Sequence, residues 1–542
     1  MKQADLILKS THIYKGTGKD TFPGFVAIAG DKILHAGPME LLDRFEGPDT
    51  KVIDFGDQLI MPGFHDAHLH AFMSGLYADP KVKVSLTDTS EEQCVAGLAD
   101  VADLVPKDKW LIGAGWYHPL WDNPVLPTKH SLDAVYPDRP VVMVSGDCHT
   151  MWVNSYGMKM LGIDKNTPDI PGGFIDRDEN GEPLGTFHEA AATSLCQAIY
   201  NFPAEEIDGF YEHFMKILNS YGITSICDMS MMAVPGMDFI RDDVYSRMEE
   251  QGKLTVRVHM YPTMVHGLER AVEMREKYQG PMLYCNGVKH FFDGVSSCHT
   301  AYLKEPYANA TYPGDVGKPT VPPDEMRKLL LEAHRNDFSM RVHTIGDQAI
   351  HLMLDYCQEA EAKYGYKPYL QHTLEHLENF QYEDIARLAK AHVLPSVQPP
   401  HALIDPKGIE RDLGLDRAQL MWPFRRMLDS GSTLAFGTDS PVVDVNPFYG
   451  LYNAITRQSA FDGKPEGGWI PQEKIAPWEA VSAYTYGSAC AANASHLYGT
   501  LAPNMFADIC VLDHNIVEGD PEDILKTSCV MTIVGGKVVY EK

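Results

Sequence analysis

The sequence lacks the features of secreted, disulfide-stabilised and membrane-spanning proteins. Its 10 cysteines are scattered singly with no CxxC pair, so neither a disulfide framework nor a thiolate zinc site is expected. No run of about 18 apolar residues occurs, and the opening segment MKQADLILKSTHIYKG has no basic stretch followed by an apolar one. These absences predict a cytoplasmic protein with no membrane partner.

Positive charge is also scarce. The 46 Lys and Arg residues stand against 74 Asp and Glu residues, which leaves a formal net charge of −28. An acidic protein repels phosphate groups, so nucleic acids and anionic membranes are not expected as partners. Apolar residues make up 44% of the 542 residues and charged residues 22%, a composition that can bury a large core. A small-molecule substrate is the partner that remains.

The two ends of the chain differ in pattern from its middle. Short β-type segments broken by Gly and Asp occur near both ends, at 4–9, 24–36, 51–54 and 507–540. Two such sets, far apart in sequence, combine most simply into one domain. We therefore expect a small β-sandwich built from residues 1–57 and 495–542.

Between these ends, apolar strand candidates alternate with segments of helical periodicity, such as 324–336 and 381–392. This alternation is typical of parallel strands joined by crossover helices. Eight strand candidates occur, at 59–64, 223–228, 255–261, 286–292, 339–344, 370–377, 392–398 and 432–438. The predicted fold class is α/β, a (β/α)8 TIM barrel over 58–494 with its active site at the carboxyl ends of the strands. Residues 72–222 are too many for one crossover, so we expect an inserted subdomain after the first barrel strand.

Ionisable side chains recur at the carboxyl ends of these strands. His68 and His70 follow the first strand two residues apart, which places both imidazoles on one face of an extended chain. Lys289 lies in the fourth strand. Burial there disfavours its ammonium form, so this lysine is paired, neutral or chemically converted, for instance into a carbamate. The fifth, sixth and eighth strands end in His343, His376 and Asp439.

Each of these residues alone has an ordinary structural explanation. A His-x-His pair arises by chance, a buried lysine forms a salt bridge, and a single histidine is more often a hydrogen-bonded core residue. Asp439 fits a turn or a helix N-cap. Their convergence on one face of a barrel is what favours a metal site, because four imidazoles and a carboxylate suit Zn²⁺ or a similar divalent ion.

The chain also contains a series of longer motifs in a fixed order, namely PGFHDAHLH, AGWYHPLW, PVVMVSGDCHTMWVNS, PGGFIDRDENGEPLGTF, GITSICD, GVKHFFDG, VHTIGDQA, LEHLE, SVQPPH, FGTDSPV and GTLAPNMFADICVLD. In order and joint occurrence they resemble the amidohydrolase superfamily, and within it the branch of YtcJ-like proteins and N-substituted formamide deformylases. The resemblance implies a (β/α)8 barrel with a small β-sandwich that binds one or two divalent metals.

The resemblance implies a metal-binding role for all six strand-end residues: His68 and His70 at the more buried metal, a carboxylated Lys289 between two metals, His343 and His376 at the second metal, and Asp439. Asp439 is also the catalytic residue. The implied cofactor is a pair of Zn²⁺ ions, with Mn, Fe or Co as alternatives. A homodimer is a common assembly for such proteins.

The expected chemistry follows from these parts. Two metals hold a bridging hydroxide that is nucleophilic at neutral pH, because metal-bound water ionises with a pKa of about 7. We therefore predict a hydrolase of a non-peptide C–N bond, such as an N-formyl or N-acyl amide, with Asp439 as base and then acid. Three alternatives stay open: a mononuclear deaminase, an esterase or lactonase that uses the same hydroxide, and a non-catalytic regulatory relative.

The substrate pocket is expected to involve aromatic or flat side chains near the matching motifs, with ordinary packing as the alternative for each. The candidates are Trp116, His149, Trp152, Phe292, His299 and Trp422. His299 marks a departure from the branch, because relatives usually read something like DGSLGSRTA where this chain has DGVSSCHTA. A shorter, titratable imidazole replaces a fixed guanidinium there, so the substrate preference of the relatives does not carry over.

Overall fold

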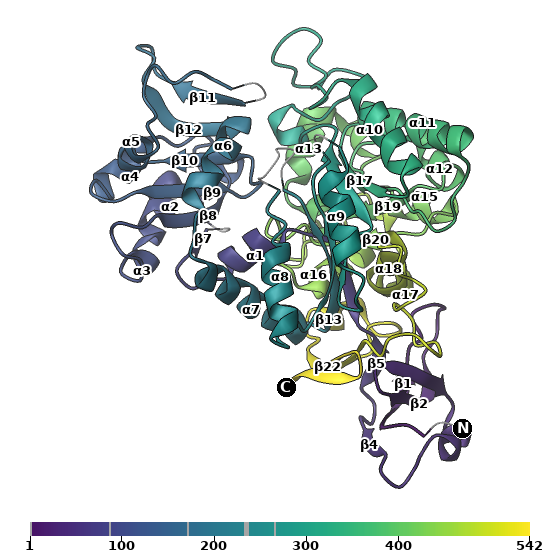
Figure 1. Ribbon diagram of the computed structural model, residues 1–542. Helices are drawn as coiled ribbons and strands as arrows, with labels where there is room; N and C mark the ends of the chain where they lie inside the picture. The colour runs from purple at the N-terminus through teal and green to yellow at the C-terminus, as the bar shows by residue number, and fades with distance from the viewer. Residues whose placement is uncertain (1–2, 86–87, 171–172, 232–237, 265–266) are drawn as a thin grey trace. The chain divides into compact units, whose positions relative to one another are not determined.

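The computed structural model (Figure 1) describes residues 3–85, 88–170, 173–231, 238–264 and 267–542. The chain divides into two compact units. Unit 1 consists of Met1–Ala71 and Met215–Lys542, and unit 2 of Phe72–Phe214. Within the described ranges, every helix is too short or too polar to cross a lipid bilayer.

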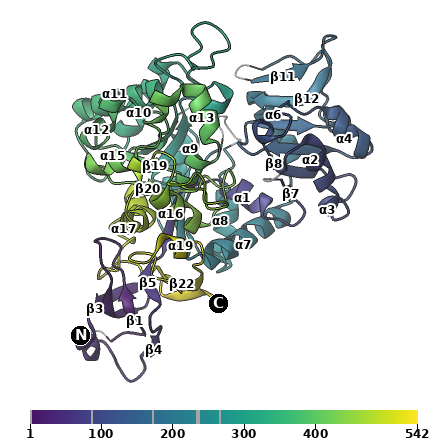
Figure 2. The same cartoon turned by 180° about the vertical axis from the view of Figure 1, so that it is seen from behind.

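Unit 1 contains a mixed β-sheet built from both ends of the chain, which lie side by side in Figures 1 and 2. Its strand order is β23-β22-β21-β5-β1-β2-β3, and β4 also pairs with β1. The antiparallel ladder of β5 and β21 joins the two ends, with Pro62 opposite Ile509. The strands are β1 (Leu6–Ile13), β2 (Phe22–Ala29), β3 (Lys32–Gly37), β4 (Lys51–Asp54), β5 (Leu59–Pro62), β21 (Ile509–Leu512), β22 (Cys529–Val534) and β23 (Lys537–Glu541).

The remaining strands of unit 1 form two parallel sheets, ordered β15-β14-β13-β6 and β16-β17-β18-β19-β20. Single parallel bridges link the two sheets, one from Thr263 to Lys289 and one from Leu69 to Ser440. The strands are β6 (Phe64–Leu69), β13 (Ile223–Met229), β14 (Arg257–Tyr261), β15 (Leu283–Tyr284), β16 (Gly287–Phe291), β17 (Ser339–Thr344), β18 (Thr373–His376), β19 (Leu394–Val397) and β20 (Ala435–Phe436).

Helices cover these parallel strands in both views (Figures 1 and 2). In α10, Met326, Leu330 and Ala333 are buried at helical spacing. Two acidic residues in its first turn and Arg335 in its last complement the helix dipole. The helices of unit 1 are α8 (Asp242–Glu250), α9 (Glu269–Lys277), α10 (Pro323–Arg335), α11 (Asp347–Tyr364), α12 (Tyr382–Lys390), α13 (Pro406–Leu413), α14 (Leu415–Ala418), α15 (Phe424–Asp429), α16 (Pro447–Thr456), α17 (Pro477–Ser482), α18 (Ser488–Ala491) and α19 (Pro521–Ile524).

The structure divides the first expected barrel strand, 59–64. Leu59–Pro62 forms β5 of the mixed sheet, and the parallel sheet begins with β6. Gly63 separates the two, and a Cβ atom there would lie 2.2 Å from the Cγ2 atom of Thr224, so only glycine allows the close approach to β13. His68 therefore lies inside β6. The other seven expected strands overlap β13, β14, β16, β17, β18, β19 and β20.

Unit 2 has its own six-stranded sheet, ordered β11-β12-β10-β9-β8-β7. Its strands are β7 (Lys83–Val84), β8 (Leu111–Trp116), β9 (Val141–Ser145), β10 (Thr150–Val153), β11 (Gly173–Arg177) and β12 (Pro183–Glu189). Its helices are α2 (Glu91–Gly97), α3 (Ala99–Ala102), α4 (Lys129–Val135), α5 (Ser155–Met160) and α6 (Ala190–Ile199), and the connecting helices are α1 (Ala71–Tyr77) and α7 (Ala204–Ser220).

Candidate metal centre

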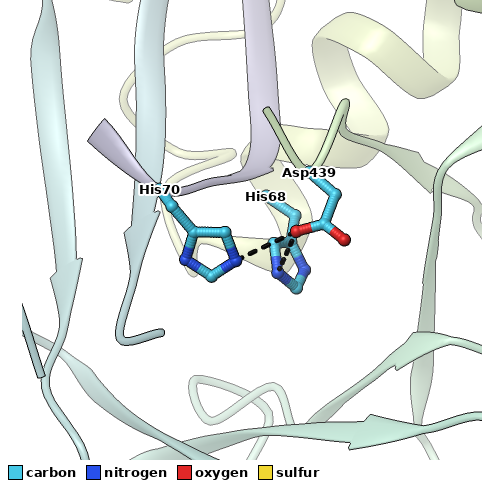
Figure 3. A group of neighbouring side chains, drawn as sticks. All are labelled: His68, His70 and Asp439. Atoms are coloured by element: carbon cyan, nitrogen blue, oxygen red, sulfur yellow. Dashed lines mark ion pairs between the residues drawn. The ribbon is translucent and has the colours of Figure 1, made fainter. Parts of the chain in front are cut away.

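The carboxyl end of β6 and the segment after β20 bring two histidines and an aspartate together (Figure 3). Nε2 of His70 lies 3.0 Å from Oδ1 of Asp439, and Nε2 of His68 lies 3.4 Å from the same oxygen. The backbone holds this geometry, because the amide of Asp439 donates to the carbonyl oxygen of His68 at 2.6 Å. All three residues are buried. The three side chains therefore converge as a set of metal ligands would.

Two further histidines lie near the other carboxylate oxygen of Asp439, Oδ2. Nδ1 of His376, at the end of β18, is 3.8 Å from Oδ2. Nε2 of His401, in the 3₁₀ helix Pro399–Leu403, is 3.9 Å from it. In this set and in the set of His68, His70 and Asp439, the ligand atoms all lie within 4.8 Å of one another. Asp439 is thus shared by two potential metal positions.

His343 and Lys289 flank these two groups. The ring of His343 lies 4.4 Å from that of His376 between centroids, and its Nε2 is 3.2 Å from the carbonyl oxygen of Gly294. Nζ of Lys289 lies 3.4 Å from Nε2 of His68. Among the described residues no carboxylate lies within salt-bridge distance of this buried amine, but those of Glu375 and Asp439 are near enough to raise its pKa against the larger, opposite effect of burial. Lys289 is therefore buried close to two carboxylates without a direct salt bridge.

The electrostatics of the centre favour the protonation states of metal ligands. Burial alone would raise the pKa of Asp439, but the neighbouring imidazoles outweigh it and hold that pKa well below its usual range. Burial, with Lys289 nearby, lowers the pKa of His68 to about 4, and it lowers the pKa of His376 well below 6.5. Metals bind the ionised carboxylate and the neutral imidazole, so these groups are already in the required forms.

One buried atom of the centre has room for a bound ion as its partner. Among the described residues, Nε2 of His401 has no hydrogen-bond partner. An unsatisfied buried polar atom costs about 1–3 kcal/mol, so such an atom in a folded protein needs an explanation. A divalent ion between His401, His376 and Asp439 would supply it. The residues of the centre therefore fit a metal.

Sequence reasoning missed four residues of this centre. Asp66 accepts hydrogen bonds from the amide of His68 at 3.0 Å and from Oγ1 of Thr438 at 2.6 Å, which ties β6 to the segment that carries Asp439. The motif HDAHLH already contained the signal, because Asp66 shares a strand face with His68. His401 closes the SVQPPH motif, and Glu375 precedes His376 in LEHLE. The four missed residues are Asp66, Arg341, Glu375 and His401.

The three substrate-pocket candidates in unit 2 make contacts within that unit. Trp116 and Trp152 lie in its hydrophobic core, where their indole N–H groups donate to the carbonyl oxygens of Met143 at 3.1 Å and Thr128 at 2.8 Å. This burial favours packing over substrate contact for both tryptophans. Nδ1 of His149 lies 2.8 Å from a carboxylate oxygen of Glu189.

The other three candidates lie in unit 1. Phe292 is fully buried and packs against Tyr356 at 6.4 Å between ring centroids. His299 is held within its own loop, because Nδ1 lies 2.7 Å from Oδ2 of Asp315 and its ring stacks on a tyrosine. The indole N–H of Trp422 is buried and has no partner among the described residues. Of these three, Trp422 is the one with an unused hydrogen-bond donor for a ligand.

Comparison with known proteins places the chain among hydrolases. The model of the family described as "Amidohydrolase family" matches residues 51–540. Putative amidohydrolase YtcJ of Bacillus subtilis (strain 168) is 29% identical over 93% of this chain and 93% of its own length. N-substituted formamide deformylase of Arthrobacter pascens is 24% identical over 99% of this chain and 98% of its own length.

The crystal structure of a metal-dependent hydrolase from Pyrococcus horikoshii OT3 has the same fold. Its TM-score is 0.76 at 23% identity, and the match covers 95% of this chain and 99% of that one. The parallel strands and helices of unit 1 are accordingly those of a TIM-barrel-like α/β protein. The resemblance predicted from the motifs is confirmed: the chain belongs to the amidohydrolase family, in the branch of YtcJ-like proteins and N-substituted formamide deformylases.

Proposed function

We propose that this protein is a metal-dependent amidohydrolase that cleaves a non-peptide C–N bond, an N-formyl or N-acyl amide. The observation that carries the proposal is the pair of ligand sets around Asp439, in each of which the ligand atoms lie within 4.8 Å of one another. The match to a relative named for its action on N-substituted formamides, over 99% of this chain, supports an amide C–N bond as the bond cleaved, rather than a particular substrate.

The residues of the centre divide between two metal positions in this proposal. His68, His70 and Asp439 hold one divalent ion, and Asp439, His376 and His401, with His343 beside them, hold the other. Such ions, when bound, polarise a carbonyl group and lower the pKa of water to about 7. Zn²⁺ suits this set of imidazoles and carboxylate best, with Mn, Fe or Co as alternatives.

Lys289 supplies the negative charge between the two positions once it is carboxylated. Burial lowers the pKa of its amine to about 8, so a larger fraction of the amine is neutral at physiological pH than in water. The neutral amine attacks the carbon of CO₂ and releases one proton, which leaves an anionic carbamate with two oxygens. The absence of an ion pair with Lys289 in the described structure is consistent with this reaction.

Asp439 moves the proton. Its carboxylate is held ionised between the two groups of imidazoles, so it accepts a proton from the attacking water. It then delivers that proton to the departing nitrogen, which leaves as an amine rather than as an amide anion. One residue therefore acts first as base and then as acid.

We also infer that the two parallel sheets close into one (β/α)8 barrel, over about residues 58–494. The two bridges between the sheets, from Thr263 to Lys289 and from Leu69 to Ser440, support this closure. Residues 1–57 and 495–542 then form the small β domain, and the insertion at about 72–222 leaves the barrel after its first strand.

Metal analysis of the purified protein, combined with a screen of formamides, acyl-amino acids, cyclic amides and esters, tests the proposal. We expect about two ions per chain and hydrolysis of a formamide or acyl amide. Full activity in exhaustively metal-free protein would contradict it. A single ion together with ammonia release from a ring amine would identify a mononuclear deaminase instead.

A further inference from the structure

A buried ion pair lies directly behind His68. Oε2 of Glu375 is 2.7 Å from Nδ1 of His68, and Oε1 accepts a hydrogen bond from Nε of Arg341. All three side chains are fully buried. Each carboxylate oxygen of Glu375 therefore has one donor, and the two donors lie on opposite sides of the carboxylate.

Arg341 is itself fixed in place by several strands. Its Nη2 donates to the carbonyl oxygen of Ala67 in β6 at 2.7 Å and to Oγ of Ser396 in β19 at 3.4 Å. Its Nη1 donates to the carbonyl oxygen of Ala491 at 3.2 Å. A guanidinium has donors only, so Oε1 of Glu375 must be the acceptor. Burial would raise the pKa of Glu375, but Arg341 and His68 outweigh it and keep that pKa well below its usual range.

We propose that Glu375 and Arg341 are positioning residues that hold His68 as the Nδ1–H tautomer, with Nε2 unprotonated and aimed at the metal centre. Nε2 is the nitrogen that faces Oδ1 of Asp439 and Nζ of Lys289, both at 3.4 Å. Metals bind the imidazole nitrogen that lacks a proton. A carboxylate behind such a histidine fixes its ring and raises its basicity. The inference rests on the proposed metal centre.

His70 also carries a proton on Nδ1, but a different group accepts it. Its Nδ1 lies 2.8 Å from the carbonyl oxygen of Met229, and a carbonyl oxygen only accepts, so Nδ1 carries the proton. The acceptor in this contact is a backbone atom, so no side-chain substitution at Glu375 removes it. A change at Glu375 should therefore alter His68 and leave His70 as it is, which makes His70 an internal reference.

The variant Glu375→Gln should invert the tautomer of His68. Arg341 offers only donors, so the amide oxygen must face Arg341 and the amide NH₂ must face His68. The NH₂ then donates to Nδ1, and the imidazole proton moves to Nε2, the nitrogen that the metal needs. We expect the affinity for Zn²⁺, measured by competition with a chromophoric chelator, to fall by about 10–100-fold. Glu375→Asp keeps a carboxylate and should recover part of this loss.

Glu473→Gln is the matched control. Glu473 is also fully buried and pairs with an arginine, with Oε1 2.8 Å from Nη1 of Arg426, so the chemical change is the same. The Zn²⁺ affinity of this variant should equal that of the parent. An equal fall in both variants would show that any buried carboxylate has the same effect and would overturn the proposal.

The tautomer can be read without metal. In metal-free protein labelled with ¹⁵N-histidine, long-range ¹H–¹⁵N spectra should show His68 protonated on Nδ1, with its signals assigned by their loss in His68→Asn. Glu375→Gln should move the proton to Nε2. A parent His68 protonated on Nε2 would overturn the proposal, even if Glu375→Gln fails to fold. A parent with the expected tautomer that binds no Zn²⁺ would instead refute the metal centre.

Discussion

We expect the buried ammonium group of Lys289 to lower the free energy of unfolding of the metal-free protein. Its amine is fully buried and forms no salt bridge among the described residues, and the nearby carboxylates of Glu375 and Asp439 offset only part of the effect of burial. Burial lowers its pKa from 10.5 to about 8. One pKa unit corresponds to about 1.4 kcal/mol, so carrying this ammonium group in the folded, metal-free protein costs ~3 kcal/mol at pH 7.

The direction in which stability changes with pH follows from proton binding to Lys289. Because the pKa is lower in the folded state, the unfolded chain holds the proton over the interval from about 8 to 10.5 while the folded protein does not. Stability therefore rises with pH across this interval. The full penalty is present below pH 8 and is gone above about 10.5. Lys289→Met keeps most of the side-chain volume and removes the charge.

Urea unfolding of metal-free protein in CO₂-depleted buffer measures the effect. At pH 7, Lys289→Met should raise the free energy of unfolding by up to ~3 kcal/mol, and the gain should shrink toward pH 10.5. The metal-free protein is thus stabilised by a change that removes the proposed carbamate. Lys328→Met, at an exposed position of α10, serves as control and should change stability little. A Lys289→Met variant that unfolds at lower urea concentration than the parent at pH 7 would refute the reasoning.

Three further predictions concern the centre and the sheet that adjoins it. A chelator should abolish hydrolysis, and Zn²⁺, Mn²⁺ or Co²⁺ should restore it, as followed by turnover and metal content; activity that survives complete metal removal would exclude the centre. Asp439→Asn keeps the shape but loses the proton acceptor, so kcat should fall by roughly 10²-fold or more even when excess Zn²⁺ keeps the centre loaded; unchanged turnover would leave Asp439 a structural role only. Nε of the buried Arg257 lies 2.6 Å from Oδ2 of Asp508. Asp508→Ala leaves this arginine without its partner, so the free energy of unfolding should fall by about 3–5 kcal/mol. A loss below about 1 kcal/mol in urea titration would contradict this.

The parallel strands could be predicted from the sequence because strands covered on both faces are largely apolar. The first of them was misplaced for a physical reason. The apolar run 59–64 continues across Gly63, where the structure divides it between β5 and the start of β6. Which half joins which sheet is decided by partners far along the chain, since β5 pairs with β21 and β6 with β13.

The candidate site could be predicted where its residues follow strands directly. His68, His70, His376 and Asp439 were expected at strand ends, and they lie together in the structure. His401 lies in a 3₁₀ helix beyond β19 and has no metal-binding neighbour at a telling spacing in sequence. The aromatic candidates were the least predictable group. Tryptophans such as Trp116 and Trp152 fill cores as readily as they line pockets.

The ladder between β5 and β21 has a consequence for biosynthesis. The strand that ends at Pro62 leaves the ribosome long before its partner, which begins at Ile509. Protein synthesis adds about 5–20 residues per second, so β5 stays without that partner for roughly 20–90 s. During this interval an apolar strand edge is open to other chains. The nascent protein thus has its greatest exposure to aggregation and to chaperones while the catalytic region is being made, and release of the last strands closes that edge.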